Sequence, residues 1–85
     1  MKRSYQNFLI RLEAARLRTK LERRALVHHV TLLELYEGPN RAPSITAARR
    51  DAYRWLTDEG KGNNEIARLF DRTPSSVSNL LCEKP

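Results

Sequence analysis

Residues 4–37 contain neither glycine nor proline, and this uninterrupted run constrains the fold more than any other feature of the chain. The run is rich in Leu, Ala, Arg, Glu and Lys, which all have good helix propensity. Apolar residues recur along it at about every 3.6 positions and form one stripe of Ile10, Ala14, Leu17, Leu21, Ala25, Leu32 and Leu35. The pattern predicts a long basic helix over residues 1–37.

A second apolar stripe lies roughly opposite the first and is formed by Phe8, Leu12, Ala15, Leu26, Val30 and Leu33. It is empty over residues 19–24, so the predicted helix has two apolar faces only at its ends. An unbroken helix of this length would extend about 50 Å, which is too long for the rest of an 85-residue chain to cover. Two solutions stay open: a partner chain covers the second stripe, which would make a homodimer, or the helix bends near residues 19–24.

A glycine and two prolines within residues 38–44 stop any helix, so we interpret this segment as a linker. Ser44 can cap a second helix, which carries Trp55 on its buried face and ends near Gly60. The sequence therefore predicts an all-α fold, in which the helix of residues 1–37, the linker and a three-helix unit of residues 45–85 pack as a single domain.

The end of the chain carries the pattern of two short helices joined by a three-residue turn. Thr73 followed by Pro74 favours a helix start, because the Thr oxygen accepts hydrogen bonds from free amides and proline needs no N–H in the first turn. Asp71 stands where such a turn needs a left-handed backbone, which Asp tolerates better than most residues. Small Ala67 allows the second helix to cross closely over the first. The pattern is typical of a helix-turn-helix.

With Val77 and Leu80 facing the core, a step of about 100° per residue points Ser75 and Asn79 outward. Asn can pair bidentately with adenine, and Ser can bond phosphates or base edges. The residues of this unit expected to contact DNA are Arg68, Arg72, Thr73, Ser75, Ser76, Ser78 and Asn79.

The charge of the chain, +6 at pH 7, favours a polyanionic partner. Residues 1–24 hold eight basic and two acidic side chains, so the whole excess lies in the first quarter. We expect electrostatic contacts to phosphates from Arg11, Arg16, Arg18, Lys20, Arg23 and Arg24. The alternative is a solvated helix face that binds no ligand.

Several function classes find no support. The one cysteine, Cys82, permits no intramolecular disulfide, and with two histidines it cannot complete a usual zinc site. His28 and His29 point about 100° apart on a helix, so we interpret His28 as a core or interface residue. No nucleophile lies in a triad-like context and no glycine-rich phosphate loop occurs, so we expect no enzyme activity, cofactor or metal.

No apolar run reaches the roughly 18 residues of a membrane span, and the opening residues lack the apolar core of a secretory signal. We therefore expect no membrane partner and a location in the reducing cytoplasm, associated with the nucleoid.

The segments Ile45-Thr-Ala-Ala-Arg-Arg-Asp-Ala-Tyr-Arg-Trp-Leu-Thr57 and Asn64-Glu-Ile-Ala-Arg-Leu-Phe70, followed by Arg72 and Ser75-Ser-Val77, resemble the C-terminal DNA-binding domain of the bacterial replication initiator DnaA. The resemblance covers about residues 45–84. It implies that Arg49 enters a minor groove and that Arg72, Ser75 and Ser76 touch backbone and bases; neighbouring Arg50 is a further expected DNA contact. The family's Gly-Arg-Asp-His-Thr-Thr motif is Asp71-Arg-Thr-Pro-Ser-Ser76 here, so its base-reading His has no counterpart.

Taken together, these features predict a small, dimeric regulator of transcription or replication that binds double-stranded DNA through its last helix. The competing interpretation is a protein-interaction module or inhibitor, which docks a partner protein through residues 5–36 of its basic N-terminal helix.

Overall fold

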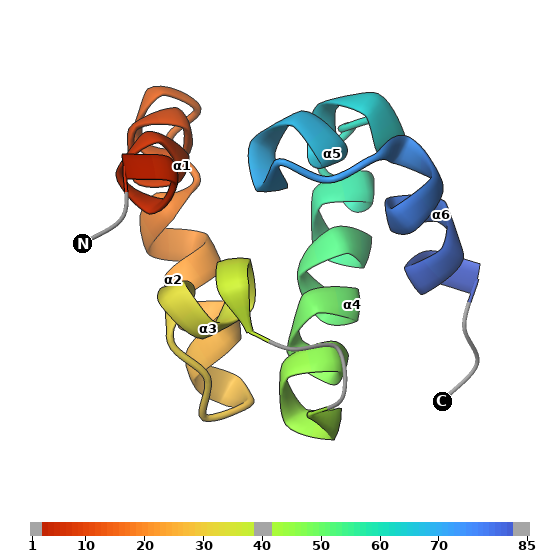
Figure 1. Cartoon of the computed structure of the whole chain (residues 1–85), viewed down its shortest axis with the longest axis horizontal. Helices are drawn as coiled ribbons and strands as arrows, with labels where there is room; N and C mark the ends of the chain where they lie inside the picture. The colour runs from red at the N-terminus through yellow and green to blue at the C-terminus, as the bar shows by residue number, and fades with distance from the viewer. Residues whose placement is uncertain (1–2, 39–41, 83–85) are drawn as a thin grey trace.

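The computed structural model describes residues 3–38 and 42–82, and within them the chain is entirely helical, without strands (Figure 1). The all-α class is thus confirmed. The helices are α1 (Arg3–Ala14), α2 (Arg18–Val27), α3 (Leu32–Glu37), α4 (Pro43–Asp58), α5 (Asn63–Phe70) and α6 (Pro74–Cys82). None of them is long and apolar enough to cross a membrane. Residues 39–41 of the predicted linker lie outside the described residues.

The prediction of one long helix over residues 1–37 is wrong, because this segment forms α1, α2 and α3. The chain turns after α1 and after α2, where Arg16 and His29 take left-handed backbone angles, each with φ of 59°. The alternative of a bend near residues 19–24 comes closer: the chain breaks just before this stretch, between Ala14 and Arg18, while residues 19–24 themselves lie inside α2. Folding back allows one short chain to cover its own apolar residues, which a straight helix could not do.

Both turns close with the same backbone hydrogen bonds. After α1, the N–H of Leu17 donates to Leu12 O at 2.8 Å, and after α2 the N–H of Val30 donates to Ala25 O at 3.0 Å. In each turn the donor residue directly follows the left-handed residue, which is the hydrogen-bond pattern of a Schellman helix end. The apolar side chains of both donor residues, Leu17 and Val30, are buried. Arg16 and His29 thus occupy positions at which glycine is usual.

The start of α3 is fixed by side chains. Thr31 Oγ1 accepts a hydrogen bond from the Glu34 N–H at 3.1 Å, and the Glu34 carboxylate accepts one from the Thr31 N–H at 3.1 Å. This reciprocal capping box satisfies two amides that the helix leaves free. The expected cap by Ser44 is wrong, because Pro43 takes the first position of α4 and Ala42 precedes it.

Helix α4 lies at the centre of the molecule, with α2 and α3 packed on one side and α6 on another (Figure 1). The two apolar stripes of the N-terminal segment are only partly buried: Leu21 is fully covered, whereas Ile10 and Leu26 are 61% and 69% exposed. Trp55, expected in the core, is half-buried at its edge.

Aromatic rings join the N-terminal helices to the last three. Phe8 of α1 stacks on Tyr36 of α3 with ring centroids 4.6 Å apart, and it contacts Phe70 of α5 at 5.1 Å. Tyr53 of α4 meets Phe70 edge-on, also at 5.1 Å. Such pairs add to the area buried, so this cluster ties α1, α3, α4 and α5 together.

Replacing His29 by glycine tests the break between α2 and α3. We expect His29→Gly to raise the free energy of unfolding by about 0.5–1 kcal/mol, because glycine adopts positive φ without a steric cost and the His29 side chain is exposed. Arg23→Gly, inside α2, should lower it by about 1 kcal/mol. Urea unfolding measures both, and a loss of stability in both variants would indicate an unbroken helix.

Candidate nucleic-acid interface

Helices α5 and α6 and the turn between them occur where the sequence predicts them. Asp71 takes the left-handed conformation, with φ of 53° and ψ of 42°, and the N–H of the next residue, Arg72, donates to Ala67 O at 2.8 Å. Ala67 is buried, as expected for a small residue at a helix crossing. Thr73 caps α6, because its Oγ1 accepts a hydrogen bond from the Ser76 N–H at 3.2 Å.

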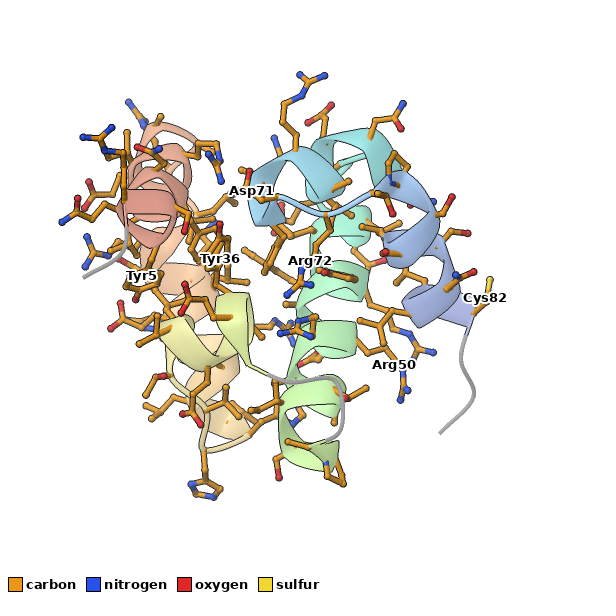
Figure 2. The ribbon with its side chains drawn as sticks, viewed as in Figure 1. Tyr5, Tyr36, Arg50, Asp71, Arg72 and Cys82 are labelled. Atoms are coloured by element: carbon orange, nitrogen blue, oxygen red, sulfur yellow. The ribbon has the colours of Figure 1, made fainter. Side chains whose placement is uncertain are left out.

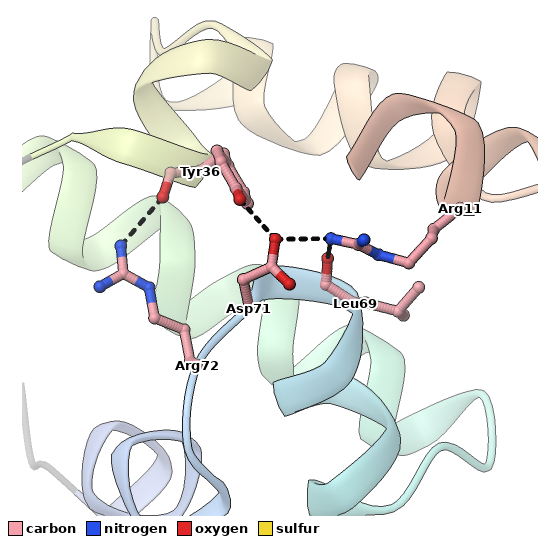
Figure 3. A network of polar contacts seen from close by, with 5 residues as sticks. All are labelled: Arg11, Tyr36, Leu69, Asp71 and Arg72. Atoms are coloured by element: carbon pink, nitrogen blue, oxygen red, sulfur yellow. Dashed lines mark hydrogen bonds and ion pairs between the residues drawn. The ribbon is translucent and has the colours of Figure 1, made fainter. Parts of the chain in front are cut away.

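Side chains from α1 and α3 hold this turn in place (Figure 3). A guanidinium nitrogen of Arg11 donates to Asp71 Oδ2 at 2.8 Å and to Leu69 O at 3.2 Å. The Tyr36 hydroxyl donates to the same carboxylate oxygen, and Arg72 donates to Tyr36 O at 2.9 Å. The end of α5 and the turn are therefore bonded to two helices that lie far away in the sequence.

The charge of Asp71 is stabilised by these bonds. Partial burial raises the pKa of Asp71, but the hydrogen bonds from Tyr36 and Arg11 outweigh burial and bring the pKa below its ordinary value. Burial and the bond to Asp71 raise the pKa of Tyr36. At neutral pH the pair is thus a neutral phenol and a carboxylate.

Helix α6 is anchored by one face and exposed on the other. Val77 is fully buried, and Leu80 and Leu81 pack against the core. Ser75, Ser76 and Asn79 are exposed and Ser78 is half-buried, which agrees with the orientation predicted for this helix. Within the part of the chain that the structure describes, the side chains of Ser75 and Asn79 form no hydrogen bond, so their polar groups are available to a ligand.

The arginines of α4, α5 and the turn differ in what they can offer. Arg68 of α5 is exposed, and it takes part in no ion pair within residues 3–38 and 42–82. Arg72 is half-buried and holds the turn. Arg50 extends from α4 toward α6, and its Nε donates to Leu80 O at 3.4 Å (Figure 2).

Arg49 does not lie where the resemblance places it. Its side chain is only 3% exposed, and it donates hydrogen bonds to Leu35 O at 3.0 Å and Gly38 O at 2.9 Å. These carbonyls lie at the end of α3, so Arg49 satisfies acceptors that the helix leaves free. Burial lowers the pKa of Arg49, and the nearby guanidinium of Arg72 acts in the same direction. The expected minor-groove contact is therefore corrected to a structural role.

A hollow of about 260 Å³ lies between α4 and α6. Arg72, Ser76 and Asn79 line it together with Thr46 and Arg49. The structure thus brings several of the predicted DNA contacts to one concave surface.

The N-terminal cations form a separate group. Helix α2 lies on the opposite side of α4 from α6 (Figure 1). Half of the predicted phosphate contacts are ion-paired: Arg11 with Asp71, Arg18 with Glu13 and Arg24 with Asp51. The other half, Arg16, Lys20 and Arg23, are exposed and have no ion pair with any described residue. The structure does not bring these three to the α6 surface.

Arg24 and His28 connect α2 to α4. His28 Nε2 lies 3.1 Å from Asp51 Oδ2, the carboxylate whose other oxygen accepts from Arg24 at 3.1 Å. The Arg24 guanidinium also lies 5.8 Å from the centre of the Trp55 ring, which is cation–π distance. His28 is half-buried at this contact between helices.

No group of His, Cys, Asp and Glu side chains among the described residues could hold a metal ion. Comparisons of the chain with known protein families, with characterised proteins and with solved structures find no match.

The structural role of Arg49 leads to a stability prediction. Arg49→Met removes the donors to one buried and one partly buried carbonyl, and we expect the free energy of unfolding to fall by about 2 kcal/mol. Arg54→Met, on the exposed surface of the same helix, should change it by less than about 0.5 kcal/mol. Chemical unfolding measures the stability of both variants, and equal stabilities would show that the hydrogen bonds of Arg49 do not stabilise the fold.

The bonds to Asp71 predict a pH-dependent contribution to stability. Because the folded-state pKa lies below the unfolded value of about 4, this contribution is complete above that value and is lost as pH falls through the folded-state pKa. Asp71→Asn keeps a residue that tolerates the left-handed turn and should cost about 1 kcal/mol at pH 7. Urea unfolding should give a smaller difference in the free energy of unfolding between variant and wild type at pH 3 than at pH 7. An equal difference at both pH values would show that the substitution acts through the shape of the side chain rather than through its charge.

Proposed function

We propose that this protein binds double-stranded DNA through a helix-turn-helix formed by α5, the turn and α6, as a small regulator of transcription or replication. The observation that carries the proposal is that α6 is anchored in the core by one face and exposes polar side chains on the other. Val77 fixes one face of the helix in the core, while Ser75, Ser76 and Asn79 are exposed on the other. The Ser76 hydroxyl bonds Thr73 Oγ1 at 2.9 Å, whereas Ser75 and Asn79 form no side-chain hydrogen bond with the described residues, and a rigidly held helix with exposed polar side chains suits the reading of base edges.

In this proposal α6 lies in the major groove, where Asn79 pairs with an adenine edge and the hydroxyls of Ser75 and Ser76 bond bases or phosphates. Exposed Arg68 contacts the DNA backbone. Arg72 lines the hollow beside α6 and adds positive charge there. The function is binding, without a catalytic step, and association with the nucleoid follows from it.

The resemblance of residues 45–84 to the DNA-binding domain of DnaA supports the same docking mode. The proposal leaves out a minor-groove arginine at position 49, because that guanidinium bonds the end of α3. It also leaves out a homodimer, since the expected dimer depended on an unbroken two-faced helix and the segment folds back on itself instead.

Fluorescence anisotropy with a labelled duplex of about 30 base pairs, titrated across salt, tests the proposal. Wild type should bind with a moderate salt dependence, because Arg68 and Arg72 supply the positive charge in this proposal, and Asn79→Ala should reduce discrimination between sites by about 1–3 kcal/mol. The triple variant Ser75→Ala, Ser76→Ala, Asn79→Ala should lose selectivity altogether, while Arg68→Ala should weaken binding to all sequences alike.

A matched control removes three exposed polar side chains elsewhere: Gln6→Ala, Asn7→Ala, Thr19→Ala, in α1 and α2. This variant should bind like wild type. Failure of wild type to bind at low salt, or unchanged selectivity in the α6 triple variant, would overturn the proposal.

A further inference from the structure

Helix α2 carries a mixed basic and apolar surface on the side that faces away from the core. Lys20 and Arg23 are exposed, and Leu26 and Val27 are 69% and 75% exposed. At about 100° per residue these four side chains point away from the two buried residues of the helix, Leu21 and Ala25. We call Lys20, Arg23, Leu26 and Val27 the outer face of α2.

The charge of this face is not balanced by the protein itself. Neither Lys20 nor Arg23 forms an ion pair with any residue in the described ranges, whereas neighbouring Arg24 is bonded to Asp51. Glu22 is on the flank toward Tyr5 of α1, with which its charge interacts. The outer face therefore presents two uncompensated positive charges next to two uncovered apolar side chains.

The outer face is also separate from the proposed DNA surface. Helix α2 packs on α4 through its buried side, and α6 packs on a different side of α4 (Figure 1). DNA bound along α6 would leave the outer face of α2 open.

The chemistry of the face selects its partner. A phosphate backbone satisfies Lys20 and Arg23 but offers nothing to cover Leu26 and Val27, whose exposure to water is unfavourable. A second copy of the same face would bring two further cations and no carboxylate, so Lys20 and Arg23 would stay uncompensated. A surface that carries both carboxylates and apolar side chains complements all four residues.

We propose that the outer face of α2 docks an acidic amphipathic helix of another protein. Carboxylates of that helix pair with Lys20 and Arg23, and its apolar side chains cover Leu26 and Val27. The four residues span about two helical turns, so the partner contributes a short helix whose anchors recur every three or four residues. The contact is small, of the size found in transient regulatory complexes.

A designed peptide tests this proposal on the full chain. The probe is a synthetic helical peptide with a glutamate face and a leucine face, compared with a scrambled peptide of the same composition. Titration of the ¹⁵N-labelled protein, followed by amide chemical shifts, should give changes centred on α2. The scrambled peptide should bind about tenfold more weakly, because its leucines no longer share one face.

Charge-matched variants locate the site. Lys20→Glu with Arg23→Glu should weaken the designed peptide by at least about tenfold, because repulsion replaces two attractive pairs. Leu26→Ser with Val27→Ser should also weaken it, since the apolar contact is lost. Arg3→Glu with Arg54→Glu changes the net charge equally at exposed positions outside the outer face, and should alter binding less than about threefold.

Other results would overturn the proposal. Equal binding of the two peptides, or an equal loss of binding in the two charge variants, would show that the attraction is non-specific. Absence of chemical-shift changes on α2 would show that the peptide does not bind this face. Shifts on α2 produced only by duplex DNA or by phosphatidylserine vesicles would assign the face to phosphates. Self-association that is abolished by Leu26→Ser with Val27→Ser would assign it to a second copy. Peptide binding does not depend on DNA binding, so this inference and the proposed function succeed or fail separately.

Discussion

The carboxylate of Asp71 accepts polar bonds from two helices of the N-terminal half at once and holds the turn of the C-terminal half against them. Arg11 reaches it from α1 and Tyr36 reaches it from α3, across 60 and 35 residues of sequence. The same residue supplies the left-handed turn that separates α5 from α6. Since Phe8 packs on Tyr36 and on Phe70, the residue before Asp71, the orientation of α6 depends on helices near the start of the chain. The N-terminal helices are thus part of the scaffold of the proposed recognition helix.

Helix α4 separates two surfaces with different chemistry. The α6 side offers hydroxyl and amide groups with few free charges nearby, whereas the α2 side offers cations and apolar side chains. The excess positive charge of the first 24 residues therefore does not measure directly how strongly the α6 surface attracts DNA. We infer that selectivity at α6 comes from hydrogen bonds to bases, while the α2 side serves a different partner.

The sequence predicts the C-terminal part of this fold well because the relevant signals are local. Thr73 with Pro74 marks a helix start, and a three-residue turn around Asp71 fixes how α5 and α6 follow each other. Gly60 likewise marks the end of α4 with φ of 94°. The ends of α1 and α2 use the same hydrogen-bond pattern but place Arg16 and His29 at the left-handed position, so no glycine announces them. The spacing of Thr31 and Glu34 was a readable capping signal for α3 that the helical periodicity obscured.

The site is less predictable than the fold, because burial of a polar side chain depends on distant partners. Nothing near Arg49 in the sequence indicates that carbonyls of α3 will accept its hydrogen bonds. The contact of Arg11 with Asp71 has no sequence signature either, since it forms only after α1 packs on α5. By contrast, the exposed face of α6 follows from helical periodicity once Val77 is assigned to the core.

The most direct test of the central claim is an amide chemical-shift map of the ¹⁵N-labelled protein as a DNA duplex is added. If α6 reads DNA, the shifts should concentrate on the first turns of α6, on the turn at Arg72 and around Arg68, with little change on α2. A map centred on α2, or no change at low salt, would contradict the assignment of α6 as the DNA-reading helix.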